Sequence, residues 1–476
     1  MKLATKLNSK MRNRILILLL AIVIFIPLHP VQAQDAVGPI YIVQSGDSLS
    51  SIASRFSVSL DALMTVNGII DANQLVVGQQ LIIPGLEGVT GILNTRFINF
   101  GDSYRSMLRQ TQVPEDLFKT LNHVVSPSEF YVGVNMIFPE QEQTQYKKRL
   151  TPSQGESLLE IAIKNNTDPW TLSKINDLSG AWDGLPGDTL YAPGEAGSGN
   201  ASGLPSAFIS AEIRDLPIKQ GGTGVLKVVT QPDVKLGGVL VDHPLNFFPI
   251  GDGSQVALQG VHALLDPGVY PLRLDATLPD GSMQSYEQLI LITSGYYQDI
   301  TISVPPETLD QSVTEPEIQQ ILSIVSPITG TKNWNTIFNM PVAEQFCITD
   351  WFGIRRTYIG QGSDLTLNGF HSGVDYGICS ETNPYDIYAP APGTVVFSDF
   401  LTVRGNATII DHGWGVYSGF WHQEESYVSA GQYVEAGTLI GKIGGTGRVT
   451  GPHLHWELWV NGVQVDPLDW LSQPYP

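Results

Sequence analysis

Two short motifs in this chain contain residues whose chemical types and spacing are suited to binding a metal ion. They are His371-x-x-x-Asp375 and His453-x-His455. Residues four apart lie on one side of a helix turn or a strand, and residues two apart project from one face of a strand. Two imidazoles and one carboxylate supply three ligands for a zinc ion. A fourth tetrahedral position then stays open for water, as in catalytic rather than structural zinc sites.

Only one histidine of the second motif is needed to complete this ligand set. The other is then available for proton transfer, together with His422. Isolated histidines in a β-rich domain are more often structural, and we interpret His412, His243 and His262 in that way.

The N-terminus has the pattern of a secretory signal peptide. Five basic residues within residues 2–14 precede the apolar run Ile15–Ile26, and small residues near Ala33 offer a cleavage site. An uncleaved membrane anchor is the alternative. Cleavage after residue 33 would change the formal net charge from −20 to −25. Such an acidic chain, without a basic patch, is a poor candidate for binding nucleic acid.

The composition predicts several β-rich domains and one disulfide. Length alone, 476 residues, allows three or more domains, and 48 glycines with 31 prolines favour short strands joined by turns. The two cysteines, Cys347 and Cys379, are expected to form a disulfide in an exported protein, with two buried free thiols as the alternative. The sequence sets no oligomeric state.

The first segment after the predicted signal reads as a β-α-α-β unit. Gly46 follows a short strand, Ser48 or Asp47 can cap a first helix, Ser59 can cap a second, and a closing strand follows Gly78. Residues 40–84 resemble a LysM domain, a module that binds peptidoglycan and chitin.

Four landmarks of this unit recur twice, which predicts tandem repeats over 95–139 and 148–193. The two later copies depart from the family pattern, so sugar binding and a spacer role both stay open for them. The landmarks of the three copies are Gly46, Asn67, Gly78 and Pro84; Gly101, Asn122, Gly133 and Pro139; and Gly155, Asn176, Gly187 and Pro193.

The middle of the chain contains a linker, a β domain and a connector. Residues 194–205 are rich in glycine and small residues, as in flexible linkers. Residues 206–304 alternate polar and apolar residues between turn signals, which favours an immunoglobulin-like β-sandwich that acts as a spacer or a weak binding domain. Residues 305–326 form a connector in which a short helix is expected to start near Pro316.

Residues 327–471 contain seven ordered segments that resemble the LytM/lysostaphin-type zinc metallopeptidases, a family that includes cell-wall endopeptidases. The segments are Phe352–Arg355, Phe370–Asp375, Ala389–Val396, Asn406–Gly413, Phe420–His422, Val434–Gly441 and Gly451–Glu457. This resemblance implies a mainly antiparallel β domain. It also implies that His371, Asp375 and His455 bind Zn²⁺, while His422 and His453 are catalytic residues that do not bind the metal.

The two resemblances together imply a secreted or cell-wall-associated peptidoglycan hydrolase. LysM modules would hold it on glycan, and the zinc endopeptidase would cleave peptide crosslinks. The membrane would be a partner only if the signal segment stays uncleaved. A non-catalytic wall-bound scaffold or amidase activator is the main alternative, and a carbohydrate-binding adhesin with a vestigial peptidase is a third interpretation.

Overall fold

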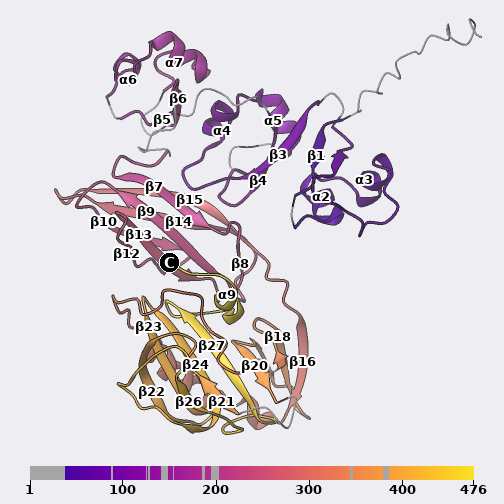
Figure 1. The fold of residues 1–476 in the computed structure, drawn as a ribbon, viewed down its shortest axis with the longest axis vertical. Coiled ribbons are helices and arrows are strands. Elements are labelled where there is room, and N and C mark those ends of the chain that lie inside the picture. Colours follow the sequence, from indigo (N-terminus) through magenta and orange to yellow (C-terminus); the bar gives the residue numbers. More distant parts are fainter. Residues whose placement is uncertain are drawn as a thin grey trace, which may run out of the picture. The chain divides into compact units, whose positions relative to one another are not determined.

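The computed structural model divides into two compact units, Met1–Asn94 and Thr95–Pro476, which are described separately (Figure 1). The predicted signal segment and Cys379 lie outside the residues that the structure describes. Among the described helices, none combines the length and apolarity that a membrane span requires. The described residues are 38–44, 46–86, 89–124, 126, 129–140, 148–153, 155–184, 188–194, 203–343, 347–378 and 385–476.

The first unit contains the β-α-α-β order expected for residues 40–84. The strand β1 pairs antiparallel with β2, and the two helices bury apolar side chains that include Leu49, Ile52 and Leu63. Ser48 and Ser59 cap the helices through their side-chain oxygens, which accept backbone N–H groups that have no partner within a helix. The elements are β1 (Ile40–Ile42), α2 (Leu49–Arg55), α3 (Leu60–Val66) and β2 (Gln80–Ile82).

The same order of elements occurs twice more along the chain. Ser103 and Ser157 cap the first helix of each copy, at the positions equivalent to Ser48. The elements are β3 (Ile92–Phe97), α4 (Tyr104–Thr111), α5 (Glu115–Asn122) and β4 (Asn135–Pro139), and then β5 (Lys148–Leu150), α6 (Leu158–Lys164), α7 (Pro169–Ile175) and β6 (Leu190–Ala192).

One asparagine joins the second helix to the closing strand in every copy. The amide of Asn176 donates to the carbonyls of Leu172, at 2.8 Å, and Tyr191, at 2.7 Å, and its oxygen accepts the N–H of Tyr191 at 2.6 Å. Asn67 and Asn122 make the same three bonds to residues four before and fifteen after them. The recurring asparagine therefore lies at the end of a helix and also ties that helix to the closing strand through its side-chain hydrogen bonds.

The region expected to be a β domain contains two sheets, ordered β11-β10-β14-β15-β8 and β12-β13-β9-β7. Alternate residues of both sheets, such as Leu226 and Leu272, meet in one core. The strands are β7 (Phe208–Arg214), β8 (Ile218–Lys219), β9 (Thr223–Thr230), β10 (Lys235–Leu240), β11 (His243–Pro244), β12 (Phe248–Pro249), β13 (Ser254–Gly260), β14 (Gly268–Thr277) and β15 (Met283–Thr293).

The connector contains more regular structure than the sequence suggested. It consists of the 3₁₀ turn η2 (Pro306–Leu309) and the helix α8 (Gln311–Val325), and the strand β16 (Asp299–Val304) directly precedes it. The helix was expected to start near Pro316, but it begins five residues earlier because Asp310 caps it by accepting the N–H of Ser312. Pro316 thus lies inside the helix, where it forgoes one backbone hydrogen bond.

The C-terminal domain is built on a ten-stranded sheet whose main path is β17-β20-β27-β24-β23-β22-β25, and its pairings are antiparallel as expected. Its elements are β17 (Cys347–Asp350), β18 (Arg355–Gly360), β19 (Thr366–Phe370), β20 (Val374–Gly377), β21 (Asp386–Tyr388), β22 (Gly393–Leu401), β23 (Gly405–Gly413), β24 (Val416–Ser426), β25 (Tyr433–Val434), β26 (Leu439–Ile443), β27 (His453–Val460), β28 (Val463–Val465) and α9 (Pro467–Ser472).

Both faces of this sheet are covered by chain that precedes the domain. On one face, Val256 and Leu258 of β13 join a continuous core with Trp456 and Leu458. On the other face, the helix α8 packs in a cluster that includes Trp421 and Trp459. In addition, β16 pairs in parallel with β18. The middle β region is therefore packed directly onto the C-terminal domain.

Candidate metal centre

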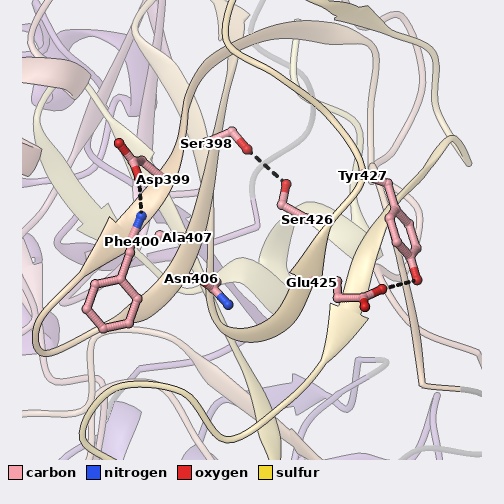
Figure 2. Close-up of a pocket in the computed structure, with 8 residues that line it drawn as sticks. All are labelled: Ser398, Asp399, Phe400, Asn406, Ala407, Glu425, Ser426 and Tyr427. Atoms are coloured by element: carbon pink, nitrogen blue, oxygen red, sulfur yellow. Dashed lines mark hydrogen bonds between the residues drawn. The ribbon is translucent and has the colours of Figure 1, made fainter.

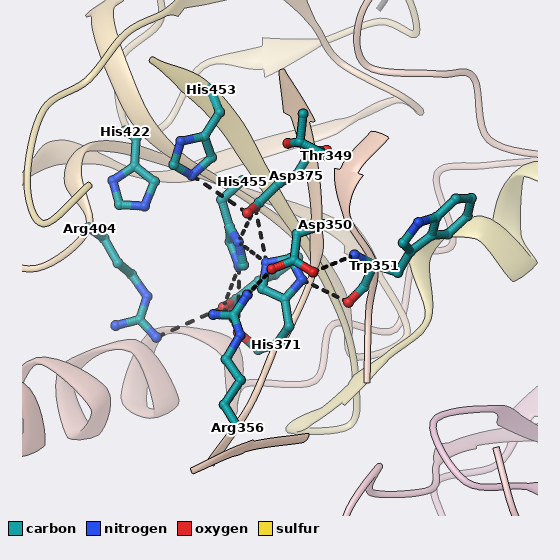
Figure 3. A network of polar contacts seen from close by, with 12 residues as sticks. Thr349, Asp350, Trp351, Arg356, His371, Asp375, Arg404, His422, His453 and His455 are labelled. Carbon is teal, nitrogen blue, oxygen red and sulfur yellow. Dashed lines mark hydrogen bonds and ion pairs between the residues drawn. The ribbon is translucent and has the colours of Figure 1, made fainter. Parts of the chain in front are cut away.

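Strand register brings the two histidine motifs together. Asp375 of β20 lies opposite His455 of β27, because these strands pair antiparallel. His371 directly follows β19 and is held in place by two backbone hydrogen bonds, one from its N–H to Ile354 and one from the N–H of Gly353 to its carbonyl. Residues about 80 positions apart in the chain thus point at one another (Figure 3).

Three atoms converge on a point that could hold a metal ion. His371 Nε2 lies 3.0 Å from Asp375 Oδ1 and 3.0 Å from His455 Nδ1, and His455 Nδ1 lies 2.7 Å from Asp375 Oδ1. Bonds of ~2.1 Å at tetrahedral angles would place ligand atoms ~3.4 Å apart. The donor set is chemically right for zinc, and the three atoms would need to separate by roughly 0.4 to 0.7 Å to hold it.

The tautomer of His371 leaves the correct nitrogen for a metal. Its Nδ1 donates to the carbonyl of Trp351 at 2.9 Å, so Nε2 carries the lone pair that faces the cluster. The side chain is 2% exposed, and burial lowers the pKa of His371. A neutral imidazole is the form that binds a metal.

Charge in the cluster favours a cation. Burial raises the pKa of the Asp375 carboxyl, but hydrogen bonds to His371 and His455 outweigh it and hold that pKa well below its usual range. For His455, burial lowers the pKa, but hydrogen bonds to Asp375 and Glu457 outweigh this and raise it to about 9. The carboxylates thus attract positive charge, whether it is a proton or a metal ion.

Glu457 holds the far side of His455, a role that sequence reasoning did not assign. Its Oε1 lies 3.3 Å from His455 Nε2 and accepts the hydroxyl of Ser372 at 2.6 Å, while Oε2 accepts the indole N–H of Trp459 at 3.0 Å. A carboxylate on the second nitrogen of a ligand histidine fixes its tautomer and ring orientation. The signal in the sequence was its position two residues after His455, on the same strand face.

His422 and His453 lie beside the cluster without joining it. Their ring centroids are 4.9 Å apart, and His453 Nε2 is 3.8 Å from Asp375 Oδ2. Each donates its Nδ1–H to a backbone carbonyl, that of Thr446 or Gly451, at 2.9 Å. The backbone contact of each ring therefore leaves its Nε2 available. Burial lowers the pKa of His422 to about 4, so its neutral form dominates near pH 7.

The other histidines singled out in the sequence lie elsewhere, and so does Cys347. His412 is fully buried, with its nitrogens bonded to the Pro392 carbonyl and the Ser418 hydroxyl, while His243 and His262 belong to the middle β region. There is no free cysteine among the described residues, and Cys347 lies in β17. The disulfide with Cys379 stays a prediction.

A separate open pocket of about 500 Å³ lies on the strands β22 to β24 (Figure 2). None of the five histidine and aspartate residues considered above lines it. Its lining residues are Ser398, Asp399, Phe400, Asn406, Ala407, Glu425, Ser426 and Tyr427.

Comparison with known families agrees with this geometry. Residues 369–467 match Peptidase family M23, and residues 41–84 match the LysM domain. The chain therefore carries an M23 peptidase domain, the lysostaphin/LytM type, preceded by a LysM domain, which confirms both resemblances seen in the sequence.

Similar curated proteins have names that describe cell-wall enzymes and one activator. The peptidoglycan DD-endopeptidase ShyC of Vibrio cholerae is 39% identical over 97 residues, which are 20% of this chain and 22% of ShyC. The DD-carboxypeptidase/endopeptidase Mpg of Neisseria meningitidis is 38% identical over 106 residues, 22% of this chain and 24% of Mpg. The murein hydrolase activator EnvC of Escherichia coli is 34% identical over 91 residues, 18% of this chain and 21% of EnvC. The aligned segments thus span less than a quarter of each relative.

Proposed function

We propose that this chain is a zinc-dependent peptidoglycan endopeptidase that cleaves peptide crosslinks of the bacterial cell wall. The observation that carries the proposal is the convergence of His371, Asp375 and His455, whose ligand atoms all lie within 4.8 Å of one another. The M23 match over residues 369–467 and the names of ShyC and Mpg support the reaction type and the substrate class.

Each side chain has a definable task in this reaction. Zinc held by the three ligands would lower the pKa of a bound water toward ~7 and so supply a nucleophile near neutral pH. His453, with its free Nε2 facing the cluster, is assigned to take up the proton. His422 is assigned to hold the developing negative charge or to donate to the leaving amine, and for either task its Nε2 must first take up a proton, such as one that the attacking water releases.

The remaining domains would keep the enzyme on its substrate. The LysM domain is assigned to glycan, and tethering raises the local concentration of crosslinks, so a modest affinity suffices. The copies at 95–139 and 148–193 are proposed as further LysM-like modules, with sugar binding or spacing as their role. The two-sheet region at 206–304 is proposed as an immunoglobulin-like sandwich, and the N-terminal signal would place the protein in the envelope or outside the cell.

Digestion of defined peptidoglycan tests the proposal. The purified protein should release muropeptides whose masses, measured by mass spectrometry, identify a cleaved crosslink. A chelator should stop the reaction and added zinc should restore it. His455→Ala should be inactive, while the matched control His243→Ala, in the middle β region, should keep full activity. Intact sacculi after incubation with zinc-loaded protein would refute the proposal.

A non-catalytic activator is the second candidate, and the similarity to EnvC favours it. The complete set of three candidate ligands and two neighbouring histidines argues for catalysis instead. The two functions separate in one experiment, because an activator would stimulate a purified amidase while releasing nothing on its own, and His455→Ala would leave that stimulation intact. An adhesin with a vestigial peptidase would bind the cell wall but would neither release muropeptides nor stimulate the amidase.

A further inference from the structure

The connector helix α8 carries a buried carboxylate that is linked to the metal centre through Arg404 and Glu457. Glu317 is 6% exposed and lies outside the residues that match Peptidase family M23. Its Oε2 accepts the N–H of Val403 at 2.8 Å, and its Oε1 accepts the N–H and the Nη1 of Arg404, each at 3.2 Å. A buried carboxylate is costly unless it is paired, so Glu317 and the turn between β22 and β23 stabilise each other.

Arg404 extends this contact toward the centre in two directions. Its guanidinium lies over the ring of Trp421, 5.3 Å from the ring centroid, and its Nη2 is 3.9 Å from Glu457 Oε1. Its carbonyl accepts the N–H of His422 at 2.8 Å, and His422 has a left-handed φ of 63° that depends on such support.

The helix and the ligand strand share one face of the sheet. His455, Glu457 and Trp459 alternate along β27, so their side chains project from the same face. Ile321 and Val325, one and two helical turns after Glu317, lie in the same apolar cluster as Trp459. Helix α8 therefore covers the apolar end of the face whose other end carries the metal-ligand histidine.

We propose that Glu317 is a positioning residue of the metal centre. By fixing the turn that carries Arg404, it holds Glu457 in place behind His455. Through the carbonyl of Arg404 it also fixes the backbone of His422. The connector thus positions residues of the metal centre and is more than a linker between domains. This inference rests on the proposed function only in that the centre binds zinc.

Glu317→Gln tests the inference, with Glu315→Gln as its control. Both substitutions remove one carboxylate from the same helix, but Glu315 is exposed and pairs only locally with Gln319. Metal-free full-length protein is titrated with zinc against a chromophoric chelator. Loss of a direct partner of a metal ligand weakens binding ~10–100-fold. Glu317 is two residues further away, because it acts through Arg404 and then Glu457, so we expect Kd to rise about 5–10-fold, kcat to fall and KM to stay unchanged. Glu315→Gln should change none of these.

A double-mutant cycle with Arg404→Lys separates positioning from general stability. If Glu317 acts through Arg404, the combined variant should weaken zinc binding by much less than the product of the two single effects. If Glu317→Gln does not fold, Glu317→Asp keeps the charge, withdraws the carboxylate by one methylene and should show the same direction of change.

Two results would overturn the inference. One is a lower Tm for Glu317→Gln with wild-type zinc affinity and kcat, which would make the residue merely structural. The other is a strictly multiplicative double-mutant cycle. These results differ from a failure of the proposed function, in which the wild-type protein itself would bind no zinc or cleave no crosslink.

Discussion

At the scale of single residues, the candidate centre depends on which atom of each histidine is free. Backbone carbonyls take the Nδ1–H of His371, His422 and His453, so these three rings present Nε2. His455 is turned the other way, because Glu457 faces its Nε2 and leaves Nδ1 for the cluster. This difference in orientation separates the ligand His455 from its neighbour His453.

The metal content of single variants should follow this division. Asp375→Ala removes a ligand and a charge, so we expect zinc affinity to fall by at least ~100-fold, as measured by competition with a chelator. His453→Ala should keep zinc within about threefold of wild type, yet lose ~10²–10⁴ in kcat, because proton transfer is impaired while the ligands stay intact. Equal loss of zinc from both variants would contradict the assigned roles.

Sequence alone singled out His371, Asp375 and His455 as candidate metal ligands, because their spacing and the ordered segments around them are characteristic. It did not assign a role to Glu457, because a position two residues after His455 places both side chains on one strand face but does not show that the carboxylate meets the second nitrogen of the histidine. The role of Glu317 was still harder to predict from sequence. Its contact with Arg404 depends on how α8 packs, and this contact joins positions that are 87 residues apart. Tertiary contacts between distant segments were the missing information.

At the scale of elements, the repeats show how one residue can serve the same purpose in three places. Sequence periodicity located Asn67, Asn122 and Asn176 as landmarks, and the structure shows that each bonds the backbone at two elements. Asn176 is fully buried, so its three hydrogen bonds have no water to replace them.

Asn176→Ala removes few atoms, but it should destabilise the third repeat strongly. It leaves buried backbone groups of β6 without partners, at a cost of ~1–3 kcal/mol for each unsatisfied group. Hydrogen exchange measured by mass spectrometry should show faster exchange in α7 and β6. Asn73→Ala removes an exposed asparagine and is the control. Unchanged protection in the third repeat would mean that the hydrogen bonds of Asn176 contribute little to stability.

At the scale of the whole molecule, the middle β region, for which spacing or weak binding was expected, is packed directly onto the C-terminal domain. The alternation of polar and apolar residues and the turn residues predicted its strands. The local sequence did not show which side chains on the outer face would contact the C-terminal domain. Leu258 of β13 is 1% exposed and belongs to the same core as Val460 and Val465. Such a shared core favours joint unfolding of the two regions.

Leu258→Ala should therefore weaken both regions together. Removing a buried leucine costs ~2–5 kcal/mol, because it loses burial and leaves a cavity. Calorimetry of the full chain should show one transition for the middle and C-terminal regions, displaced to lower temperature. Leu289→Ala, whose side chain is 41% exposed, should shift it little. A separate C-terminal transition at the wild-type temperature would show that the shared core does not couple them.

The most direct test of the proposed centre is the position of the metal in a crystal of the zinc-loaded protein. Anomalous difference maps collected above and below the zinc edge should show one strong peak ~2.0–2.1 Å from His371 Nε2, Asp375 Oδ1 and His455 Nδ1, with His422 and His453 beyond bonding distance. A peak elsewhere, or no peak at those three residues in zinc-saturated protein, would contradict the account.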